Sequence, residues 1–483
     1  DYLGQVIAVN SGFKESLCGL AVDIGSTTVA AHLCNLRTGE VLASAGMMNP
    51  QIRFGEDLMS RVSYVMMHPD GDAEMTKVIR ETINELAENV VAKANRQLDE
   101  IVEVTFVGNP IMHHLLLGIS PLELGGAPFA LATDESVRIR ARDLKLKLHT
   151  NTRCYVLPCI AGHVGADTAG MILSEAPHKR EAITLLVDIG TNAEIVLGNK
   201  ERLLAASSPT GPAFEGAQIT CGQRAAQGAI ERVRIDRKTL EPKFKIIGCD
   251  LWSDEIGFSK QTKKTGITGI CGSGIIEAIA EMYLAGVLTQ DGVINGSFAE
   301  KSERIVSEGR TFSYILHDGK QHIHISQNDV RAIQLAKAAL YAGIRLLMER
   351  LGIESVDRIR LAGAFGNHIE PKFAMILGLI PDCNLKQVSY AGNAAGTGAR
   401  IALLNHESRN EIEEVVRQVE KVETAVETNF QQHFVNAMAL PHKIDKFPNL
   451  AKEVELPADN MSENTYENAT PTAKRRRRKT TNS

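Results

Sequence analysis

The tripeptide Asp-Ile-Gly occurs twice in the chain, as Asp23-Ile24-Gly25 and as Asp188-Ile189-Gly190. Each copy ends an apolar run that is typical of a buried strand, so the strand delivers a carboxylate to the turn that follows it. The glycine lets the backbone approach an anion closely. Donors for phosphate oxygens follow at once, at Ser26, Thr27, Thr28, Thr191 and Asn192. The repeat therefore predicts two phosphate-binding turns that face each other across one cleft.

Carboxylates at such a cleft predict a metal ion beside the nucleotide. We expect Asp23 and Asp188 to bind Mg²⁺ through water, because magnesium retains much of its hydration shell in proteins. The ion would offset charge while a phosphoryl group is transferred to water. Asp167 and Glu194 are the candidates for orienting the attacking water, and a salt bridge at a strand end explains either residue nearly as well. Of these two we favour Asp167.

The elements that must position these residues follow a similar order in both halves of the chain. In the first half, the apolar pattern predicts strands at 17–24, 29–36, 41–48, 103–108 and 154–160 and a helix at 72–98. In the second half, it predicts strands at 184–188, 193–198, 202–207 and 358–361 and helices at 269–285 and 329–350. The sequence therefore predicts an α/β protein of two similar subdomains, at 17–177 and 178–407.

Other segments lie outside this repeated order. Strand-like residues at 225–265 and 287–325 indicate insertions into the second subdomain, and a charged helix begins a helical extension at 408–450. Because the chain does not begin with methionine, we interpret 1–16 as a linker from a missing upstream region. The polar segment 451–483, which ends in a basic run, is predicted to be a disordered and solvated tail.

Composition excludes several classes of function. The formal net charge is −5, and without the six positive charges of Lys474–Lys479 it would be −11 (−5 minus 6), so the body of the chain is too acidic to favour nucleic acid. No apolar run approaches the roughly eighteen residues of a spanning helix, so we expect no membrane contact and a cytoplasmic location. The eight cysteines are scattered and form no C-x-x-C pair, which predicts reduced, buried thiols rather than a zinc or iron–sulfur site.

The order of motifs resembles the ribonuclease-H-like fold of the actin-like ATPase superfamily, which includes acetate and sugar kinases, the large heat-shock chaperones and actin. Five segments carry the likeness, at 23–28, 188–194, 266–278, 361–367 and 392–398. The resemblance implies two ribonuclease-H-like subdomains that flank a nucleotide cleft. It also implies nucleotide contacts at the hinge and around adenine and ribose, from Gly272, Ser273, Gly363, Gly366, Asn367, Gly396 and Gly398. Tight packing of turns and helices is the alternative explanation for these glycines.

Three phrases resemble, more closely, the ATPase module of reductive activators of corrinoid proteins, at Phe106–His113, Pro158–Asp167 and Pro212–Ala217. That resemblance implies that ATP and Mg²⁺ drive electron transfer to a corrinoid protein of a methyltransferase system whose cobalt has become inactive Co(II). It also implies an electron donor protein and an N-terminal 2Fe-2S domain, and it allows a homodimer. The sequence lacks the C-x₄-C-x₂-C pattern of that domain, so either the domain has been removed or this member lacks it.

Three other functions stay open at this point. The related activators of 2-hydroxyacyl-CoA dehydratases hold a 4Fe-4S cluster between two subunits, but the next cysteine after Cys271 is Cys383, which counts against the closely placed pair that they need. A small-molecule kinase would need a substrate base deep in the cleft, and no residue is a strong candidate. A nucleotide-binding scaffold would keep the cleft without turnover. We interpret His113, His114 and His163 as structural or partner-contact residues, because adjacent residues on a helix point about 100° apart.

Overall fold

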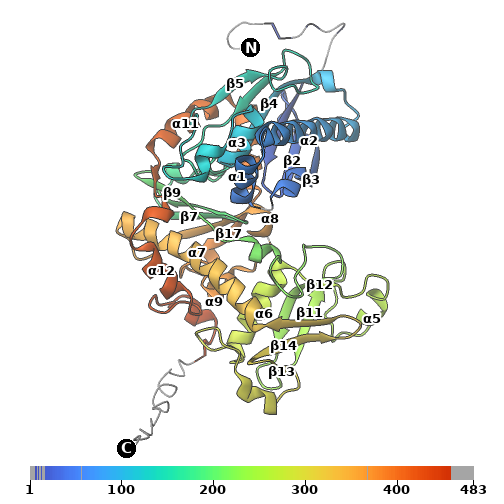
Figure 1. Cartoon of the computed structure of the whole chain (residues 1–483), viewed down its shortest axis with the longest axis vertical. Helices are drawn as coiled ribbons and strands as arrows, with labels where there is room; N and C mark the ends of the chain where they lie inside the picture. Colours follow the sequence, from blue (N-terminus) through green and yellow to red (C-terminus); the bar gives the residue numbers. More distant parts are fainter. Residues whose placement is uncertain are drawn as a thin grey trace, which may run out of the picture.

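The structure is a computed structural model that describes residues 6–7, 9, 12, 17–55, 57–366 and 368–457. Two lobes, each built around a six-stranded sheet, lie one above the other in Figure 1, and two three-stranded sheets form a third region at the lower right. The predicted fold class, an actin-like arrangement of two α/β subdomains, is confirmed. Most of the predicted linker at 1–16, together with Asn367 and the predicted tail from 458 onward, lies outside the described residues.

The first lobe contains a sheet in the order β3-β2-β1-β4-β6-β5. An antiparallel meander opens it, with β1 (Cys18–Ile24), β2 (Thr28–Asn35) and β3 (Val41–Met48). Parallel strands continue it beyond β1, with β4 (Ile101–Gly108) and β6 (Arg153–Val156), and β5 (Val137–Arg140), which the sequence did not predict, forms the edge. The helical elements are η1 (Pro50–Phe54), α1 (Leu58–Met67), α2 (Gly71–Lys93), α3 (Pro110–Leu117) and α4 (Ala166–Glu175).

The second lobe repeats this plan in a sheet of order β17-β16-β7-β8-β9-β18. Its meander is β7 (Thr184–Ile189), β8 (Ala193–Gly198) and β9 (Leu203–Ser208), and its parallel strands beyond β7 are β16 (Arg358–Ala362) and β17 (Val388–Gly392). β18 (Glu420–Lys421) pairs with β9. The helices are α7 (Gln327–Leu351), α8 (Gly363–Gly366), α9 (Pro371–Leu377), α10 (Ala394–Leu404), α11 (His406–Gln418), α12 (Phe430–Ala437) and α13 (Leu450–Glu453).

The third region comes from two segments between β9 and α7, where the sequence indicated insertions. One sheet contains β10 (Ala229–Ile235), β11 (Pro242–Ile246) and β12 (Gly269–Ile270), and the other contains β13 (Ile305–Glu308), β14 (Thr311–Asp318) and β15 (His322–Ser326). α5 (Phe258–Gln261) and α6 (Gly272–Leu284) complete it. Every residue of α6 is buried, so this helix connects the region to the rest of the second lobe through a continuous core.

Both Asp-Ile-Gly motifs lie at the ends of central strands that are covered on both faces. In β1 the aspartate Asp23 is the only residue that is not fully buried, and in β7 the same is true of Asp188. Coverage on both faces explains why these strands read as continuous apolar runs rather than as alternating ones. The two partly exposed residues are therefore the carboxylates that reach the cleft.

Two helices form a layer between the two sheets. α4 and α10 pack against each other, and a core cluster around them joins residues of β1 and β4 to residues of β7, β8 and β9. α10 follows β17 of the second sheet in the chain, yet its Ala399 carbonyl accepts a hydrogen bond from Thr105 Oγ1 of β4 at 2.8 Å. α11 likewise lies against the first lobe, where Glu413 accepts from the Tyr155 hydroxyl at 2.9 Å. These two helices thus belong to the second half of the chain but contact the first lobe.

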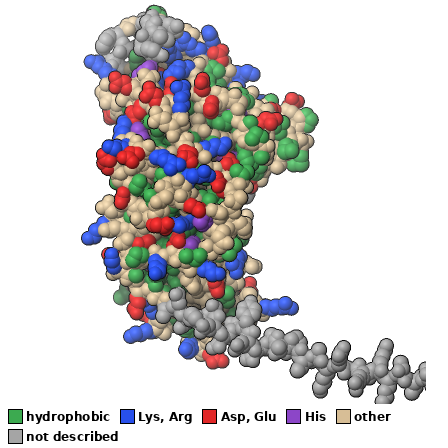
Figure 2. Space-filling view, turned by 90° about the vertical axis from the view of Figure 1, so that its left-hand side faces the viewer, with side chains coloured by type: hydrophobic (Ala, Val, Ile, Leu, Met, Phe, Trp, Pro, Cys, Tyr) green, Lys and Arg blue, Asp and Glu red, His purple; other side chains and the backbone are tan. Residues whose placement is uncertain are grey.

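The surface carries both signs of charge. Acidic and basic side chains are interspersed over the face drawn in Figure 2 and do not gather into one basic area there. Among the helices of the described residues, none combines the length and apolar character that crossing a membrane requires.

Candidate functional site

Four carboxylates converge where the two lobes meet. Asp23 and Asp188 end β1 and β7, Glu194 lies on β8 directly opposite Asp188, and Asp167 lies in the first turn of α4. Burial, opposed by a hydrogen bond from Asn393 and reinforced by the charge of Asp167, raises the pKa of Asp23 to about 7. Burial and the charges of Asp23 and Asp167 raise the pKa of Asp188 to about 7.

The other two carboxylates are perturbed in the same direction. Burial raises the pKa of Asp167 to about 6. Burial, followed by the charges of Asp167 and Asp188, holds the pKa of Glu194 well above its ordinary value. Each group thus contributes to a shared negative potential, which a bound cation would relieve. The described residues include no group of three or more His, Cys, Asp or Glu side chains that could hold a metal ion directly.

The first turn directs its carbonyl groups away from the cleft. The carbonyl oxygen of Gly25 accepts from Asn49 Nδ2 at 2.9 Å, and that of Thr27 accepts from the Asn49 N–H at 2.8 Å. The carbonyl of Ser26 accepts from Arg61 Nη2 at 2.5 Å, and that of Thr28 accepts from the Gly25 N–H at 3.0 Å. None of the hydrogen bonds of the described residues uses the N–H or hydroxyl of Ser26 or Thr27. Donors are therefore left on the side of the turn that an anion would occupy.

The second turn is held in the same way by the residue pair that follows its meander. Thr210 Oγ1 donates to the carbonyl oxygens of Gly190 at 2.7 Å and Thr191 at 3.0 Å, and the Gly211 N–H donates to Thr191 at 2.9 Å. Asn49 and Thr210 both lie just beyond the third strand of their meanders, at equivalent places in the repeat. The two lobes thus present matching donor turns.

A cavity of about 250 Å³ lies between these turns. Thr27 of the first turn and Thr191 of the second both line it, together with Glu215 and Arg224. The Thr191 hydroxyl donates to Glu215 Oε1 at 2.8 Å. A larger cavity of about 680 Å³ lies elsewhere, along α2, and is lined by no residue of either turn; the four carboxylates line neither cavity. The smaller cavity is the one whose lining matches the predicted phosphate chemistry.

Asn393 connects the first aspartate to the second half of the chain. Its Nδ2 donates to Asp23 Oδ2 at 2.9 Å, and its Oδ1 accepts from the Gly396 N–H at 2.7 Å as the N-cap of α10. Gly363, at the end of β16, has φ +85°, and a Cβ there would lie 2.2 Å from Asp188 Oδ1. The glycine therefore lets this strand end pass directly beside the second aspartate.

Packing accounts for several predicted contact residues without a ligand. A Cβ at Gly398 would lie 2.0 Å from the Gly170 carbonyl oxygen of α4, so this glycine permits close approach of two helices. A Cβ at Gly396 would lie 2.7 Å from the capping amide of Asn393, and one at Gly366 would make ordinary contacts with Leu361. Asn367 lies outside the described residues.

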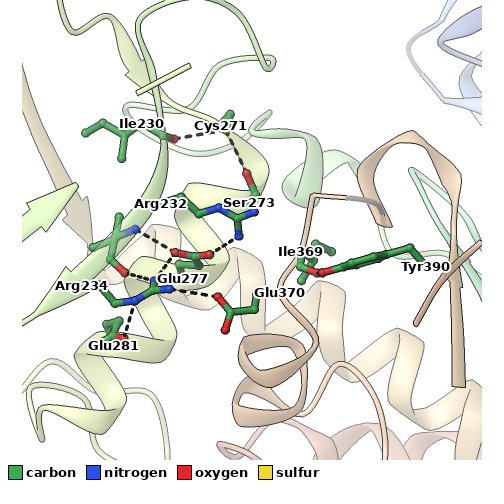
Figure 3. Close-up of polar contacts among 11 residues, drawn as sticks. Ile230, Arg232, Arg234, Cys271, Ser273, Glu277, Glu281, Ile369, Glu370 and Tyr390 are labelled. Atoms are coloured by element: carbon green, nitrogen blue, oxygen red, sulfur yellow. Dashed lines mark hydrogen bonds and ion pairs between the residues drawn. The ribbon is translucent and has the colours of Figure 1, made fainter. Parts of the chain in front are cut away.

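The predicted hinge residues at the start of α6 lie beside a buried ion-pair network (Figure 3). Gly272 and Ser273 are buried, and the Cys271 thiol lies 3.4 Å from Ser273 Oγ. One turn further along α6, Glu277 accepts from Arg232 and Arg234 of β10, each at 2.6 Å. Arg234 also bonds Glu370, which precedes α9, at 3.1 Å. This network joins the third region to the second lobe.

Histidines and cysteines do not form an additional centre among the described residues. His113 and His114 are buried within α3, and His163 Nδ1 lies 3.2 Å from Glu423. All eight cysteines are free thiols, and seven of them are buried. Their scattered, buried positions do not fit an iron–sulfur cluster within this chain.

Sequence reasoning missed four residues that shape this site: Asn49, Arg61, Thr210 and Asn393. Two of them carried a signal as N-caps, since Asn49 follows a predicted strand and precedes Pro50, and Asn393 precedes the alanines that begin α10. Arg61 and Thr210 gave none, because their contacts join segments far apart in the chain.

Comparisons with known proteins cover both lobes. Residues 18–180 match the family described as the RACo middle region, and residues 182–451 match the one described as the C-terminal domain of RACo, the ASKHA domain. The corrinoid activation enzyme RamQ of Eubacterium limosum is 34% identical over 439 residues, which cover 88% of this chain and 71% of that protein. The [Co(II) methylated amine-specific corrinoid protein] reductase of Methanosarcina barkeri is 26% identical over 422 residues, which cover 83% of this chain and 72% of that protein.

A solved structure agrees with the sequence comparisons. The reductive activator for corrinoid,iron-sulfur protein has 35% sequence identity and a TM-score of 0.77, with 89% of this chain and 67% of that chain covered. The chain therefore spans about two thirds to three quarters of the proteins that it matches over most of its length.

Proposed function

Because the chain belongs to the family of reductive activators of corrinoid proteins, we propose that it is the ATP-hydrolysing part of an enzyme that restores an inactive Co(II) corrinoid protein. The family accounts for the general activity, which is corrinoid activation by an enzyme with an ASKHA ATPase domain. The residues that bind and hydrolyse the nucleotide are our own assignment. The observation that carries it is the pair of matching donor turns with the carboxylates between them.

In this proposal the nucleotide phosphates lie between the two turns. The N–H and hydroxyl groups of Ser26, Thr27 and Thr28 would donate to the phosphates from one lobe, and the main-chain N–H groups of Thr191 and Asn192, with the Asn192 side-chain amide, from the other. The carbonyl groups of both turns are bonded to partners within their own lobes, away from the cleft, and this supports the assignment because it leaves donors rather than acceptors facing an anion. Adenine and ribose would lie toward Gly363, at the end of β16.

The carboxylate cluster fits a magnesium ion held through water. Asp23 and Asp188 would hold the hydrated ion, which supplies positive charge to the phosphates when it is bound. Their raised pKa values support this role, since four carboxylates share one cleft without a cation of the protein bonded to them in the described ion pairs. Asp167 or Glu194 would orient the attacking water. Asn393 would keep the Asp23 carboxylate directed toward the cleft.

Electron transfer needs a component beyond the described residues. The cysteines of this chain do not fit a 2Fe-2S cluster, so we derive no electron-transfer step within it. An iron–sulfur domain or an electron donor protein would supply the electron, and closure of the lobes around ATP would drive the change at the partner. A ligand can bias such a closure only through its different affinities for the open and closed states.

We propose a corrinoid protein of a methyltransferase system as the partner. The name of the Methanosarcina relative specifies methylated amines, and that of the Eubacterium relative specifies corrinoid activation. The methyl donor served by this chain is left open.

A coupled assay tests the function. The protein is mixed with a Co(II) corrinoid protein, a reductant and an electron donor protein, while released phosphate and the visible spectrum of the corrinoid are followed. We expect Co(II) reduction to require hydrolysable ATP, and Asp188→Asn to lose both phosphate release and reduction. Equal reduction without ATP would contradict the proposal. Transfer of the phosphate to a carbohydrate acceptor would instead identify a kinase.

A further inference from the structure

A buried arginine lies directly beneath the first phosphate turn. Arg61, on α1, has no exposed surface, and its Nη2 donates to the Ser26 carbonyl oxygen at 2.5 Å. Its Nε donates to the Gly55 carbonyl at 3.0 Å, and its Nη1 lies 3.4 Å from Gln51 Oε1 and from Met112 Sδ. The guanidinium is therefore held between the helix and the turn, one peptide group away from the side on which a phosphate would bind.

This guanidinium lacks a bonded counter-charge within the part of the chain that the structure describes. None of the ion pairs of the described residues involves Arg61, and its partners are carbonyl and amide oxygens and a thioether. Burial lowers the pKa of Arg61 to about 10, with Asp57 acting in the opposite direction, so the side chain keeps its charge at neutral pH. A buried charge without an ionic partner is costly, and such a cost is retained when a ligand or function requires the charge.

The second turn shows that this fold does not need a charge at the equivalent place. There the carbonyls of Gly190 and Thr191 are held by Thr210 and Gly211, which are neutral. At that turn an acidic side chain, Glu215, accepts from the Thr191 hydroxyl. The two turns therefore match in their backbone hydrogen bonds but differ in charge. A cationic side chain, Arg61, bonds a carbonyl of the first turn, whereas the groups that bond the carbonyls of the second turn are neutral.

We propose that Arg61 is a positioning residue that makes nucleotide affinity depend on the number of phosphates. Through the Ser26 carbonyl it holds the turn with its N–H groups toward the cleft, and its charge acts across one peptide on the phosphates. This inference rests on the proposed ATP site. It assigns to α1, rather than to the cleft wall alone, the distinction between a nucleoside and its triphosphate.

The size of the effect follows from the arrangement. When opposite charges lie on the two sides of a peptide group, in surroundings with an effective dielectric constant of about 20, their attraction changes the dissociation constant of the bound anion by about tenfold or more. Because ATP carries several negative charges, we expect Arg61→Gln to weaken ATP binding about 30-fold. Adenosine has the same base and ribose without phosphate, so its affinity should change by no more than about twofold.

Calorimetric titration of the full chain with ATP, ADP and adenosine, each with Mg²⁺, tests the proposal. We expect the ratio of adenosine to ATP dissociation constants to fall about 30-fold in Arg61→Gln, and to stay within about threefold of wild type in Arg61→Lys, which keeps the charge. Arg80→Gln is the matched control, because Arg80 also donates to a main-chain carbonyl, that of Leu116 at 3.0 Å, but away from both turns. Circular dichroism and thermal unfolding establish that each variant is folded.

The possible results separate the two proposals. If the wild-type chain binds no ATP, the proposed function fails. If it binds ATP but Arg61→Gln keeps the wild-type ratio, or weakens adenosine and ATP equally, the role of Arg61 is refuted. Should Arg61→Gln not fold, Arg61→Lys decides the question by itself, and a folded Arg61→Lys protein that has lost the preference for ATP overturns the account based on charge.

Discussion

A single methyl group at Gly363 should separate activity from stability. In Gly363→Ala the new Cβ would lie 2.2 Å from Asp188 Oδ1, about an ångström closer than an ordinary contact allows. The residue also has φ +85°, which any side chain adopts with strain. The carboxylate must therefore move or rotate by about an ångström, since the backbone at the end of β16 is fixed by its pairing with β7.

The two costs have different magnitudes. The left-handed backbone should reduce the free energy of unfolding by about 1 kcal/mol, which lowers Tm by about 2–4 °C in a domain of this size. If Asp188 holds the metal ion as proposed, a displacement of its carboxylate by about 1 Å should lower kcat by about 100-fold. Loss of turnover should thus far exceed what the small change in stability explains.

Gly352→Ala provides the matched control. Gly352 caps α7 with φ +70°, and a Cβ there meets nothing within 4 Å, so the substitution has the same backbone strain without the contact. Phosphate release at saturating ATP and thermal unfolding are measured for both variants. If Gly363→Ala turns over within about threefold of Gly352→Ala, the assignment of Asp188 to the reacting site is refuted.

Further predictions concern charge. The pKa of Asp23 and of Asp188 is about 7 in the folded state and about 3.9 in the unfolded chain. Between these pH values the folded state binds more protons than the unfolded state. The free energy of unfolding should therefore fall as pH rises from about 4 to 7. Mg²⁺ should reduce that loss, and a Tm that rises over this range without Mg²⁺ would contradict the assignment. Asp188→Asn should raise Tm at pH 8 while lowering turnover at least about 100-fold, whereas lower Tm would argue against repulsion. Glu277→Gln should reduce stability by about 1–3 kcal/mol in denaturant titrations, because Arg232 and Arg234, whose side chains are about a third exposed, lose the charge of their buried partner while Arg234 keeps Glu370.

The local part of the fold could be predicted from the sequence. The strand at 193–198 was predicted with the observed limits, since a buried strand carries its own apolar pattern and its neighbouring turns mark the ends. β5 was missed because its four residues include two arginines and form a sheet edge, where the apolar signal is weak. The charged helix that begins the predicted extension at 408–450 ends at Gln418, and Glu420–Lys421 forms a strand through pairing with β9 that no local pattern shows.

The candidate site divides in a similar way. Asp23 and Asp188 could be found because the motif places each carboxylate at the end of a buried strand. Arg61 could not, since it lies in a mixed polar segment and becomes buried only through contacts with Ser26 and Met112. A nucleotide contact at Gly398 stays a prediction, whereas its contact with Gly170, a distant residue of another helix, could not be read from the sequence.

That contact between Gly398 and Gly170 has a consequence for movement between the lobes. A Cβ at either position would collide with main-chain oxygen, of Gly170 in one case and of Ala395 in the other, so α4 and α10 touch through bare backbone. Helices that interlock through side chains must lift apart before they shift, whereas two smooth backbone surfaces can slide with little loss of contact. These helices form the layer between the two sheets. We therefore expect the cleft to open and close by sliding of α4 against α10.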